Sequence, residues 1–328
     1  MTITISIATV QWEMNEPFAI SRGVVSRVEA VLVTLVDAQG NRGRGEGYGI
    51  GYEGETCAIM QQQLAGVARH VRAGATREEL LELLPHGGAR CALDCAMWDL
   101  EAKRSGRPAW ALAGLSEVHS LTTAMTIGIR SPDALRVALN RYGTYPLLKI
   151  KVGADEPLET LRTVREMAPR ARLIVDPNQA WTFSQLREYA PVCRELGVEL
   201  IEQPLPVTAD EDLRGYSCPV ALCADEAVHT RADLPAILGK YQCINIKLDK
   251  TGGLTEALLL ERQARAAGLS TMVGCMWGSS LAMAPGFILG QFCDFVDLDG
   301  PLLQKTDWPD AISYNQGYMS APRPSLWG

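Results

Sequence analysis

Residues 147–178 read LLKIKVGADEPLETLRTVREMAPRARLIVDPN, and this stretch contains the unit from which we expect the fold to be built. An apolar run at 147–152 ends in charged residues, and apolar residues then recur at helical spacing from 158 to 167. A second apolar run follows at 172–178. The order strand, helix, strand is typical of a parallel sheet, because parallel strands need a crossover connection.

The same unit recurs along most of the chain. Successive apolar runs are centred about 25 residues apart, which is the length of one strand-plus-helix unit. The runs that we expect to be strands span 124–129, 147–152, 172–178, 198–204, 220–226, 243–249, 269–275 and 295–300. Eight such units predict a closed (β/α) barrel. An open doubly wound sheet is the alternative, but no Gly-rich dinucleotide loop follows the first strand.

The first 120 residues follow a different pattern, with antiparallel strands before helices. We expect strands at 2–12, 27–37 and 41–48, and helices at 55–73, 77–83 and 88–105. The chain therefore divides into an α+β domain (1–118), the barrel (119–300), and a tail (301–328) that packs back onto the first domain.

The composition argues against several classes of partner. The 328 residues are 47% hydrophobic, carry a net charge of -7 and contain no run of basic residues, which disfavours nucleic acid and anionic membranes. The uncharged stretch 266–293 contains several glycines and Pro285, so it predicts a buried strand and a buried helix rather than a membrane span. The N-terminus lacks the pattern of a signal peptide.

Histidines and cysteines do not form a recognisable metal or disulfide pattern. The four histidines lack zinc-ligand spacing, which also disfavours a hydrolytic metal barrel. The nine cysteines are scattered, so we expect buried thiols in a reducing compartment and a cytoplasmic protein.

Charged residues cluster where the predicted barrel strands end. In such barrels the catalytic groups lie at the carboxyl ends of the strands. The polar residues at these ends are Lys149, Lys151, Asp176, Asn178, Glu202, Asp225, Glu226, Lys247, Asp249, Asp297 and Asp299.

Three consecutive strands each end in one carboxylate, and these are Asp176, Glu202 and Asp225. Oxygens from adjacent strands that converge on one point form a site for a hard cation, and Mg²⁺ prefers six oxygen ligands. The alternative is that these carboxylates form salt bridges with Arg or Lys. We predict one Mg²⁺ per subunit.

Lysines flank the predicted metal site. Strand alternation places Lys149 and Lys151 on one side, and Lys247 approaches from the other. A neighbouring ammonium group and a dication both lower the pKa of a lysine, which allows it to act as a base. A carbon held between them would have an amine on each face, for which a non-catalytic binding protein has no use.

Several motifs occur together in one chain. They are Lys149-Ile150-Lys151, Asp176-Pro177-Asn178, Glu202-Gln203-Pro204, Asp225-Glu226, Lys247-Leu248-Asp249-Lys250-Thr251-Gly252-Gly253 and Ala92-Leu93-Asp94-Cys95-Ala96-Met97-Trp98-Asp99-Leu100. In combination they resemble the muconate-lactonizing subgroup of the enolase superfamily over nearly the whole chain. The resemblance implies an α/β fold, namely a modified (β/α) TIM-type barrel covered by an N-terminal α+β capping domain.

The resemblance also implies roles for the site residues. Asp176, Glu202 and Asp225 would bind Mg²⁺. Lys151 and Lys247 would be the acid/base pair, and Lys149 would adjust the pKa of Lys151. The residues implied to support them are Asn178, Glu226 and Asp249.

The eighth strand ends in Asp297-Leu298-Asp299, which resembles the motif that dipeptide epimerases use to bind the substrate's α-ammonium group. We therefore expect a dipeptide epimerase that inverts the α-carbon of the C-terminal residue by two-lysine 1,1-proton transfer through an ene-diolate. The alternative is an N-succinylamino acid racemase or an o-succinylbenzoate synthase, whose substrates have no free ammonium group.

Further residues are candidates for substrate contact. Ile20-Ser21-Arg22-Gly23 resembles the family's mobile loop, and Arg22 would be its positive group, although Arg27 lies nearby. The other candidates are Thr126, Lys149 and Met276. The preferred dipeptide side chains stay open. The expected partner is a small molecule, with no nucleic acid or membrane, and the chain could form a homo-oligomer.

Overall fold

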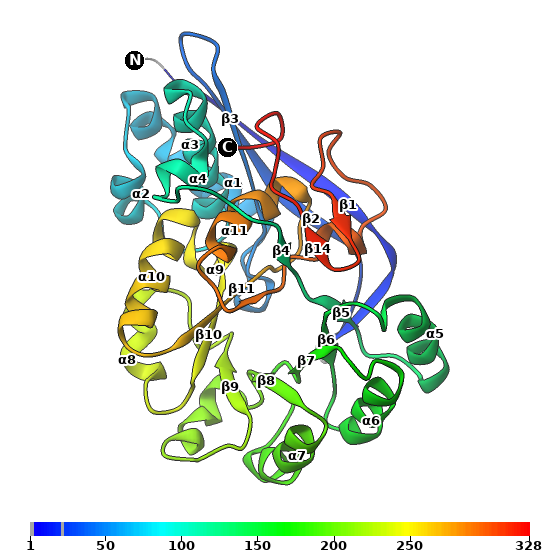
Figure 1. Cartoon of the computed structure of the whole chain (residues 1–328). Coiled ribbons are helices and arrows are strands. Elements are labelled where there is room, and N and C mark those ends of the chain that lie inside the picture. Colours follow the sequence, from blue (N-terminus) through cyan, green and yellow to red (C-terminus); the bar gives the residue numbers. More distant parts are fainter. Residues whose placement is uncertain (1–2, 21–22) are drawn as a thin grey trace.

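The computed structural model describes residues 3–20 and 23–328, which form a capping domain above a barrel (Figure 1). A three-stranded antiparallel sheet, in the order β1-β2-β3, opens the capping domain. Its strands are β1 (Thr4–Ile20), β2 (Gly23–Val36) and β3 (Arg42–Gly47). The first two strands are longer than the predicted 2–12 and 27–37, because β1 continues past a register shift between Glu13 and Phe18.

Helices cover one face of this sheet. They are η1 (Gly51–Glu53), α1 (Cys57–Ala73), α2 (Arg77–Leu83), α3 (Gly88–Ser105) and α4 (Ala109–Leu112). Helices α1, α2 and α3 match the three predicted ranges, whereas η1 and α4 were not predicted. Strand β3 alternates glycine with charged residues because α3 packs directly on its backbone. A Cβ atom at Gly45 would lie 2.1 Å from the Ala92 carbonyl oxygen. Arg44 and Glu46 therefore face away from α3.

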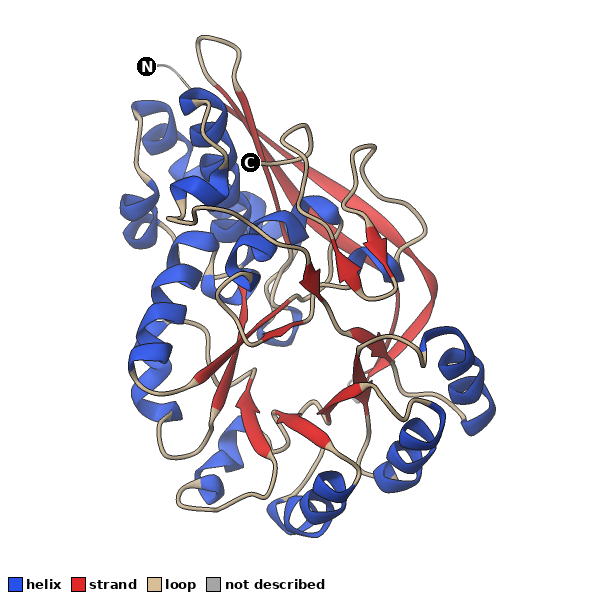
Figure 2. Ribbon diagram, in the orientation of Figure 1, coloured by secondary structure: helices blue, strands red, loops and turns tan. Residues whose placement is uncertain are grey.

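Eight parallel strands form the barrel, in the order β12-β11-β10-β9-β8-β7-β6-β5 (Figure 2). They are β5 (Met125–Ile127), β6 (Leu147–Lys151), β7 (Arg172–Asp176), β8 (Val198–Glu202), β9 (Ala221–Ala224), β10 (Cys243–Lys247), β11 (Ser270–Gly274) and β12 (Phe295–Val296). The amide of Ala124 donates to the carbonyl oxygen of Val296, which brings the first and last strands together. The predicted (β/α) barrel is confirmed.

Helices lie on the outside of this barrel. The longer ones are α5 (Pro132–Tyr142), α6 (Pro157–Met167), α7 (Phe183–Glu195), α10 (Leu254–Ala266) and α11 (Ser280–Gly290). The shorter segments are η2 (Val207–Leu213), η3 (Arg231–Asp233), α8 (Leu234–Ile237), α9 (Leu248–Thr251) and η4 (Gly300–Leu303). The unit after β8 is thus modified, since a 3₁₀ segment replaces its helix.

The eighth strand is shorter than predicted. It ends at Val296 rather than Gly300, so Asp297 and Asp299 lie beyond its regular pairing. The uncharged stretch 266–293 contains β11 and the buried helix α11, as predicted. Within residues 3–20 and 23–328, no helix combines the length and apolar character needed to cross a membrane. All nine cysteines are free thiols.

The tail returns to the capping domain. Its strand β13 (Tyr314–Asn315) pairs with β14 (Tyr318–Met319), and β14 pairs with β4 (Leu121–Thr122), which precedes the barrel. Trp327 is buried, and its indole N–H donates to the carbonyl oxygen of Cys95 at 3.0 Å. The tail therefore connects the two domains.

Candidate active site

The carboxyl ends of the barrel strands line a pocket. Its polar lining consists of Thr126, Lys149, Lys151, Asn178, Lys247, Asp297 and Asp299. Lys151 ends β6 and Lys247 ends β10, and three strands separate these two in the sheet order. In an eight-stranded barrel such strands lie on opposite sides, so the two amines approach the pocket from opposite directions.

Lys149 lies at the centre of the charged groups. Its ammonium nitrogen is 2.8 Å from a Glu202 oxygen, 2.8 Å from an Asp297 oxygen and 3.1 Å from an Asp176 oxygen. Burial opposes the charge on this ammonium, but the surrounding carboxylates outweigh burial and raise the pKa of Lys149 well above its usual value. Lys149 therefore stays protonated while these carboxylates are ionised.

The two flanking lysines each pair with one carboxylate. Lys151 Nζ is 2.6 Å from Asp176 Oδ2, and Lys247 Nζ is 2.7 Å from Asp225 Oδ2. Burial disfavours the charge on Lys247, but the carboxylate of Asp225 raises its pKa. The carboxylates around Lys149 and Lys247 thus outweigh the burial of these side chains and favour their charged forms.

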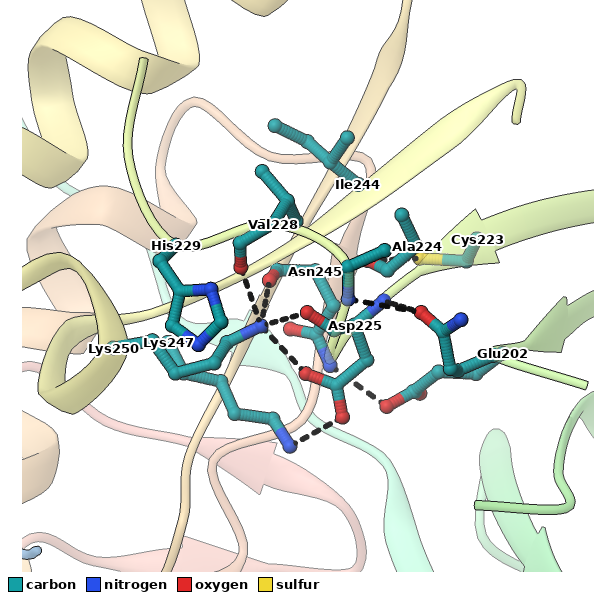
Figure 3. Close-up of polar contacts among 12 residues, drawn as sticks. Glu202, Cys223, Ala224, Asp225, Val228, His229, Ile244, Asn245, Lys247 and Lys250 are labelled. Atoms are coloured by element: carbon teal, nitrogen blue, oxygen red, sulfur yellow. Dashed lines mark hydrogen bonds and ion pairs between the residues drawn. The ribbon is translucent and has the colours of Figure 1, made fainter. Parts of the chain in front are cut away.

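Asp225 is held by two lysines at once (Figure 3). Lys247 contacts its Oδ2, while Lys250 contacts its Oδ1 at 2.7 Å. Lys250 also donates to the carbonyl oxygens of Asp225, Val228 and Asn245. The Asp225 carboxylate is consequently fixed in orientation, with one oxygen directed toward the pocket lysine.

The donor set of Asp176, Glu202 and Asp225 fits a hard divalent cation. All three are buried, and no arginine pairs with them among the described ion pairs. Burial, followed by the charge of Asp176, raises the pKa of Glu202 to about 8, and Asp225 adds to this effect. In the described part of the chain, the three carboxylates do not yet converge as a set of metal ligands, because each of them contacts a lysine. A dication would relieve their mutual repulsion.

The three residues expected to support the site have different surroundings. Asn178 lines the pocket, and its backbone N–H donates to Asp176 Oδ1 at 2.8 Å. Glu226 is buried next to Asp225. Asp249 instead accepts a hydrogen bond from the backbone N–H of Tyr48 in the capping domain at 2.9 Å, and burial raises its pKa to about 7. Asp249 therefore joins the capping domain to the barrel.

The pair Asp297 and Asp299 lines the pocket next to Thr126. The Thr126 hydroxyl donates to Asp297 Oδ1 at 3.2 Å, and its backbone N–H donates to Asp299 Oδ2 at 2.6 Å. Burial, followed by the charge of Asp297, raises the pKa of Asp299 to about 7. The two aspartates thus form an acidic end of the pocket.

An apolar wall closes another side of the pocket. It consists of Phe18, Ile20, Met276, Trp277 and Leu303. Arg22, the predicted positive group, lies outside the described residues. Arg27 lies on β2 opposite Glu13 with its side chain half exposed, so it does not line this pocket.

Sequence reasoning missed two residues near the lysines. Lys250 was part of a motif, but no pattern indicated that it contacts Asp225. Burial and the charge of Asp225 raise the pKa of Tyr52 in η1. This residue of the capping domain therefore lies close to the site. No local signal in the sequence marks Tyr52.

Family comparisons cover both domains. The N-terminal domain of mandelate racemase/muconate lactonizing enzymes matches residues 2–114, and the enolase C-terminal domain-like family matches residues 132–324. The chain is 39% identical to L-Ala-D/L-Glu epimerase of Escherichia coli K12, over 96% of this chain and 99% of that protein. It is 45% identical to N-acetyl-D-glutamate racemase of a Pseudoalteromonas species, over 76% of this chain and 79% of the relative.

Solved structures with the same fold contain dipeptides. An enolase family member from Agrobacterium tumefaciens, with bound sodium and L-Ala-L-Glu, has a TM-score of 0.96 at 41% identity, covering 99% of this chain and 100% of that one. Dipeptide epimerase of Methylococcus capsulatus, complexed with Mg and L-Arg-D-Lys, has a TM-score of 0.92 at 29% identity. That match covers 100% of this chain and 99% of the other.

Proposed function

Because this chain belongs to the mandelate racemase/muconate lactonizing enzyme family of the enolase superfamily, we propose that its pocket epimerises a dipeptide at the α-carbon of the C-terminal residue. The observation that carries this proposal is the pair Lys151 and Lys247, on opposite sides of one pocket. The enzyme is an isomerase. An acid and a base on opposite faces of one carbon are what inversion of a stereocentre requires.

The two lysines exchange a proton with the substrate. The α-carbon lies between them, so that one amine removes the α-proton and the other ammonium returns a proton to the opposite face. Asp176 and Asp225 hold the two lysine side chains in place. Lys149 stays charged and stabilises negative charge on the substrate carboxylate.

The cofactor is Mg²⁺, which Asp176, Glu202 and Asp225 would hold. When bound, it supplies positive charge beside the substrate carboxylate and makes the α-proton more acidic. The dipeptide epimerase of Methylococcus capsulatus, which has the same fold, contains Mg together with its dipeptide.

The acidic end of the pocket would receive the N-terminal ammonium group of the dipeptide. Asp297 and Asp299 provide carboxylate oxygens there, and a bound ammonium would favour the ionised form of Asp299, whose pKa is raised to about 7. Thr126 holds both aspartates through its hydroxyl and its backbone N–H.

We favour a C-terminal glutamate as the epimerised residue. Two similar proteins support it, the L-Ala-D/L-Glu epimerase of Escherichia coli and the Agrobacterium structure with L-Ala-L-Glu. The side chain would need a cation in addition to the site lysines, and Arg22 is the candidate from the sequence. The pocket wall that includes Phe18, Met276 and Trp277 would surround its methylene groups.

Racemisation of an N-acylated amino acid is the second candidate. It is favoured by the relative named N-acetyl-D-glutamate racemase and by the Asp297 carboxylate, which Lys149 and Thr126 already engage. An acyl amide N–H could then donate to Asp299 in place of an ammonium group. Cytoplasmic location and self-association stay predictions from the sequence.

The test is a library of dipeptides and N-acyl amino acids incubated in D₂O with Mg²⁺ and read by mass spectrometry. We expect one deuterium at the α-carbon of L-Ala-L-Glu, with slower exchange in dipeptides that end in an apolar residue. Lys151→Ala and Lys247→Ala should each abolish exchange for at least one enantiomer. Exchange of N-acetylglutamate but no dipeptide would support the second candidate, and full exchange in both variants would exclude the two-lysine mechanism.

A further inference from the structure

Glu46 of strand β3 is a buried carboxylate that the proposed chemistry does not use. Only 2% of the residue is exposed, and the described residues place no lysine, arginine or histidine in an ion pair with it. Because α3 covers the glycine face of β3, the Glu46 side chain faces the opposite way, toward the barrel and the tail.

The carboxylate accepts five hydrogen bonds from four residues. Its Oε1 accepts from the indole N–H of Trp12 at 3.1 Å, the hydroxyl of Tyr48 at 2.8 Å and the backbone N–H of Ser279 at 3.2 Å. Its Oε2 accepts from the Ser279 hydroxyl at 2.7 Å and the Trp308 indole at 3.1 Å. Every neighbour donates, so only a group without hydrogens satisfies all five.

Two of these bonds come from Ser279, which begins a barrel helix. Ser279 is the N-cap of α11, and its hydroxyl also accepts from the backbone N–H of Leu281. The Glu46 carboxylate therefore lies at the amino end of α11, where the helix dipole favours a negative charge. A residue of the capping domain thereby binds the N-cap of α11, while Asp307 of the tail accepts from the backbone N–H and the hydroxyl of the next residue, Ser280.

The segment just before Ser279 forms part of the substrate pocket. Strand β11 ends at Gly274, and only residues 275–279 connect it to α11. Met276 and Trp277 in this connection line the pocket, and the Trp277 ring packs edge-on against Phe18 at 5.5 Å. A shift of Ser279 would therefore move the apolar wall of the pocket.

We propose that Glu46 is a positioning residue for substrate binding, which fixes the 275–279 connection through Ser279 and so places Met276 and Trp277 against the dipeptide. This inference rests on the proposed function. A side chain that acts through the pocket wall alters substrate affinity more than the proton-transfer step, because Lys151 and Lys247 belong to other elements.

The test compares Glu46→Gln with wild type in dipeptide deuterium exchange and in thermal stabilisation by L-Ala-L-Glu with Mg²⁺. In either orientation, the glutamine N–H₂ group faces an N–H group that cannot accept, either the Trp308 indole or the Trp12 indole and the Ser279 backbone, so at least one of the five bonds is lost. We expect KM to rise about tenfold with kcat within about threefold, and stabilisation by the dipeptide to decrease.

Asp99→Asn is the matched control. Asp99 is an equally buried carboxylate of the capping domain, but it pairs with Lys103 and accepts from the backbone N–H groups of Arg44 and Gly328, with no hydrogen bond to the 275–279 connection. This variant should lose stability and keep its KM. Ser279→Ala should raise KM by about threefold, and adding Glu46→Gln to it should raise KM no further than the larger single effect.

The outcomes separate the possibilities. An unchanged KM in Glu46→Gln, or an equal rise in Asp99→Asn, would overturn the positioning role. If Glu46→Gln does not fold, an unchanged KM in Ser279→Ala overturns it instead. Wild-type protein that exchanges no dipeptide would refute the proposed function, and the positioning role with it.

Discussion

Lys250 has no exposed surface, although it carries a charge. A buried ammonium group is stable only when its donors are satisfied and its charge is balanced. Here Asp225 balances the charge, and the carbonyl oxygens of Val228 and Asn245 accept further hydrogen bonds. Asp225 also contacts Lys247 on its other oxygen, so Lys250 helps to orient the partner of a proposed catalytic lysine.

We predict that Lys250→Met lowers the free energy of unfolding by about 3–5 kcal/mol, because it leaves Asp225 Oδ1 and the carbonyl oxygens without their buried donor. Urea denaturation measures this loss. Lys305→Met, at an exposed lysine of the tail, is the control and should change stability by less than about 0.5 kcal/mol. A loss below about 1 kcal/mol at Lys250 would contradict the prediction.

Among the elements, helix α3 of the capping domain contacts the turn that follows strand β10 of the barrel. Arg90 donates to the Thr251 carbonyl oxygen at 2.7 Å, and Asp94 accepts from the Thr255 hydroxyl at 2.5 Å and its backbone N–H at 3.0 Å. Gly253 permits this approach, since it has a φ of +115° and a Cβ there would lie 2.4 Å from the Asp94 carboxylate. Gly252 and Gly253 thus allow the two domains to approach closely at this turn.

Asp94 gives a pH dependence to this contact. Burial raises its pKa to about 6 from 3.8. Between these values, Asp94 keeps its proton in the folded protein but has lost it in the unfolded chain. The contribution of Asp94 to stability is therefore fully present at low pH and falls as the pH rises from about 4 to about 6. Each pKa unit is worth about 1.4 kcal/mol, which gives about 3 kcal/mol in total.

We predict that the stability difference between wild type and Asp94→Asn changes by about 3 kcal/mol across this range, to the disadvantage of wild type at higher pH. Urea denaturation of both proteins at several pH values from 4 to 7 measures it, and the other titrating groups cancel in the difference. A difference that stays constant with pH would show that Asp94 has an ordinary pKa in the folded protein.

At the scale of the whole molecule, the tail fastens the capping domain over the barrel. Trp327 packs into the main hydrophobic core and donates to the Cys95 carbonyl oxygen, and Arg44 donates to the carbonyl oxygen of Leu326. Nearer the barrel, Trp308 contacts Glu46 and Ser279. The pocket lies between the two domains, since Phe18 and Trp277 from different domains pack together there.

We predict that Trp327→Ala lowers the free energy of unfolding by about 3–5 kcal/mol, because it leaves a large cavity between α3 and the tail. Chemical denaturation followed by circular dichroism would measure it. Tyr318→Ala provides the comparison, since that residue is 52% exposed and the loss of its ring should cost less than about 1 kcal/mol. Equal effects in the two variants would mean that the tail does not fasten the domains.

The sequence alone was enough to predict the barrel and the polar residues at or just beyond the carboxyl ends of its strands. Apolar runs alternate with amphipathic helices at a regular interval, and this periodicity is local, so it can be recognised without knowing any long-range contact. Strand lengths were less certain. The first strand was predicted to end at residue 12, but β1 continues to Ile20 across the register shift between Glu13 and Phe18. Pro17 lies within this irregular stretch, where its missing N–H costs no ladder hydrogen bond to β2.

Only the tertiary structure decided how the site residues are connected. The sequence indicated lysines and carboxylates at the strand ends, but it did not show that Lys250 and Lys247 share Asp225, or that Asp249 contacts Tyr48 across the domain boundary. Glu46 and Ser279 are 233 residues apart, and nothing local to either one indicates the other. Such contacts depend on the packing of whole elements, which periodicity within one element does not specify.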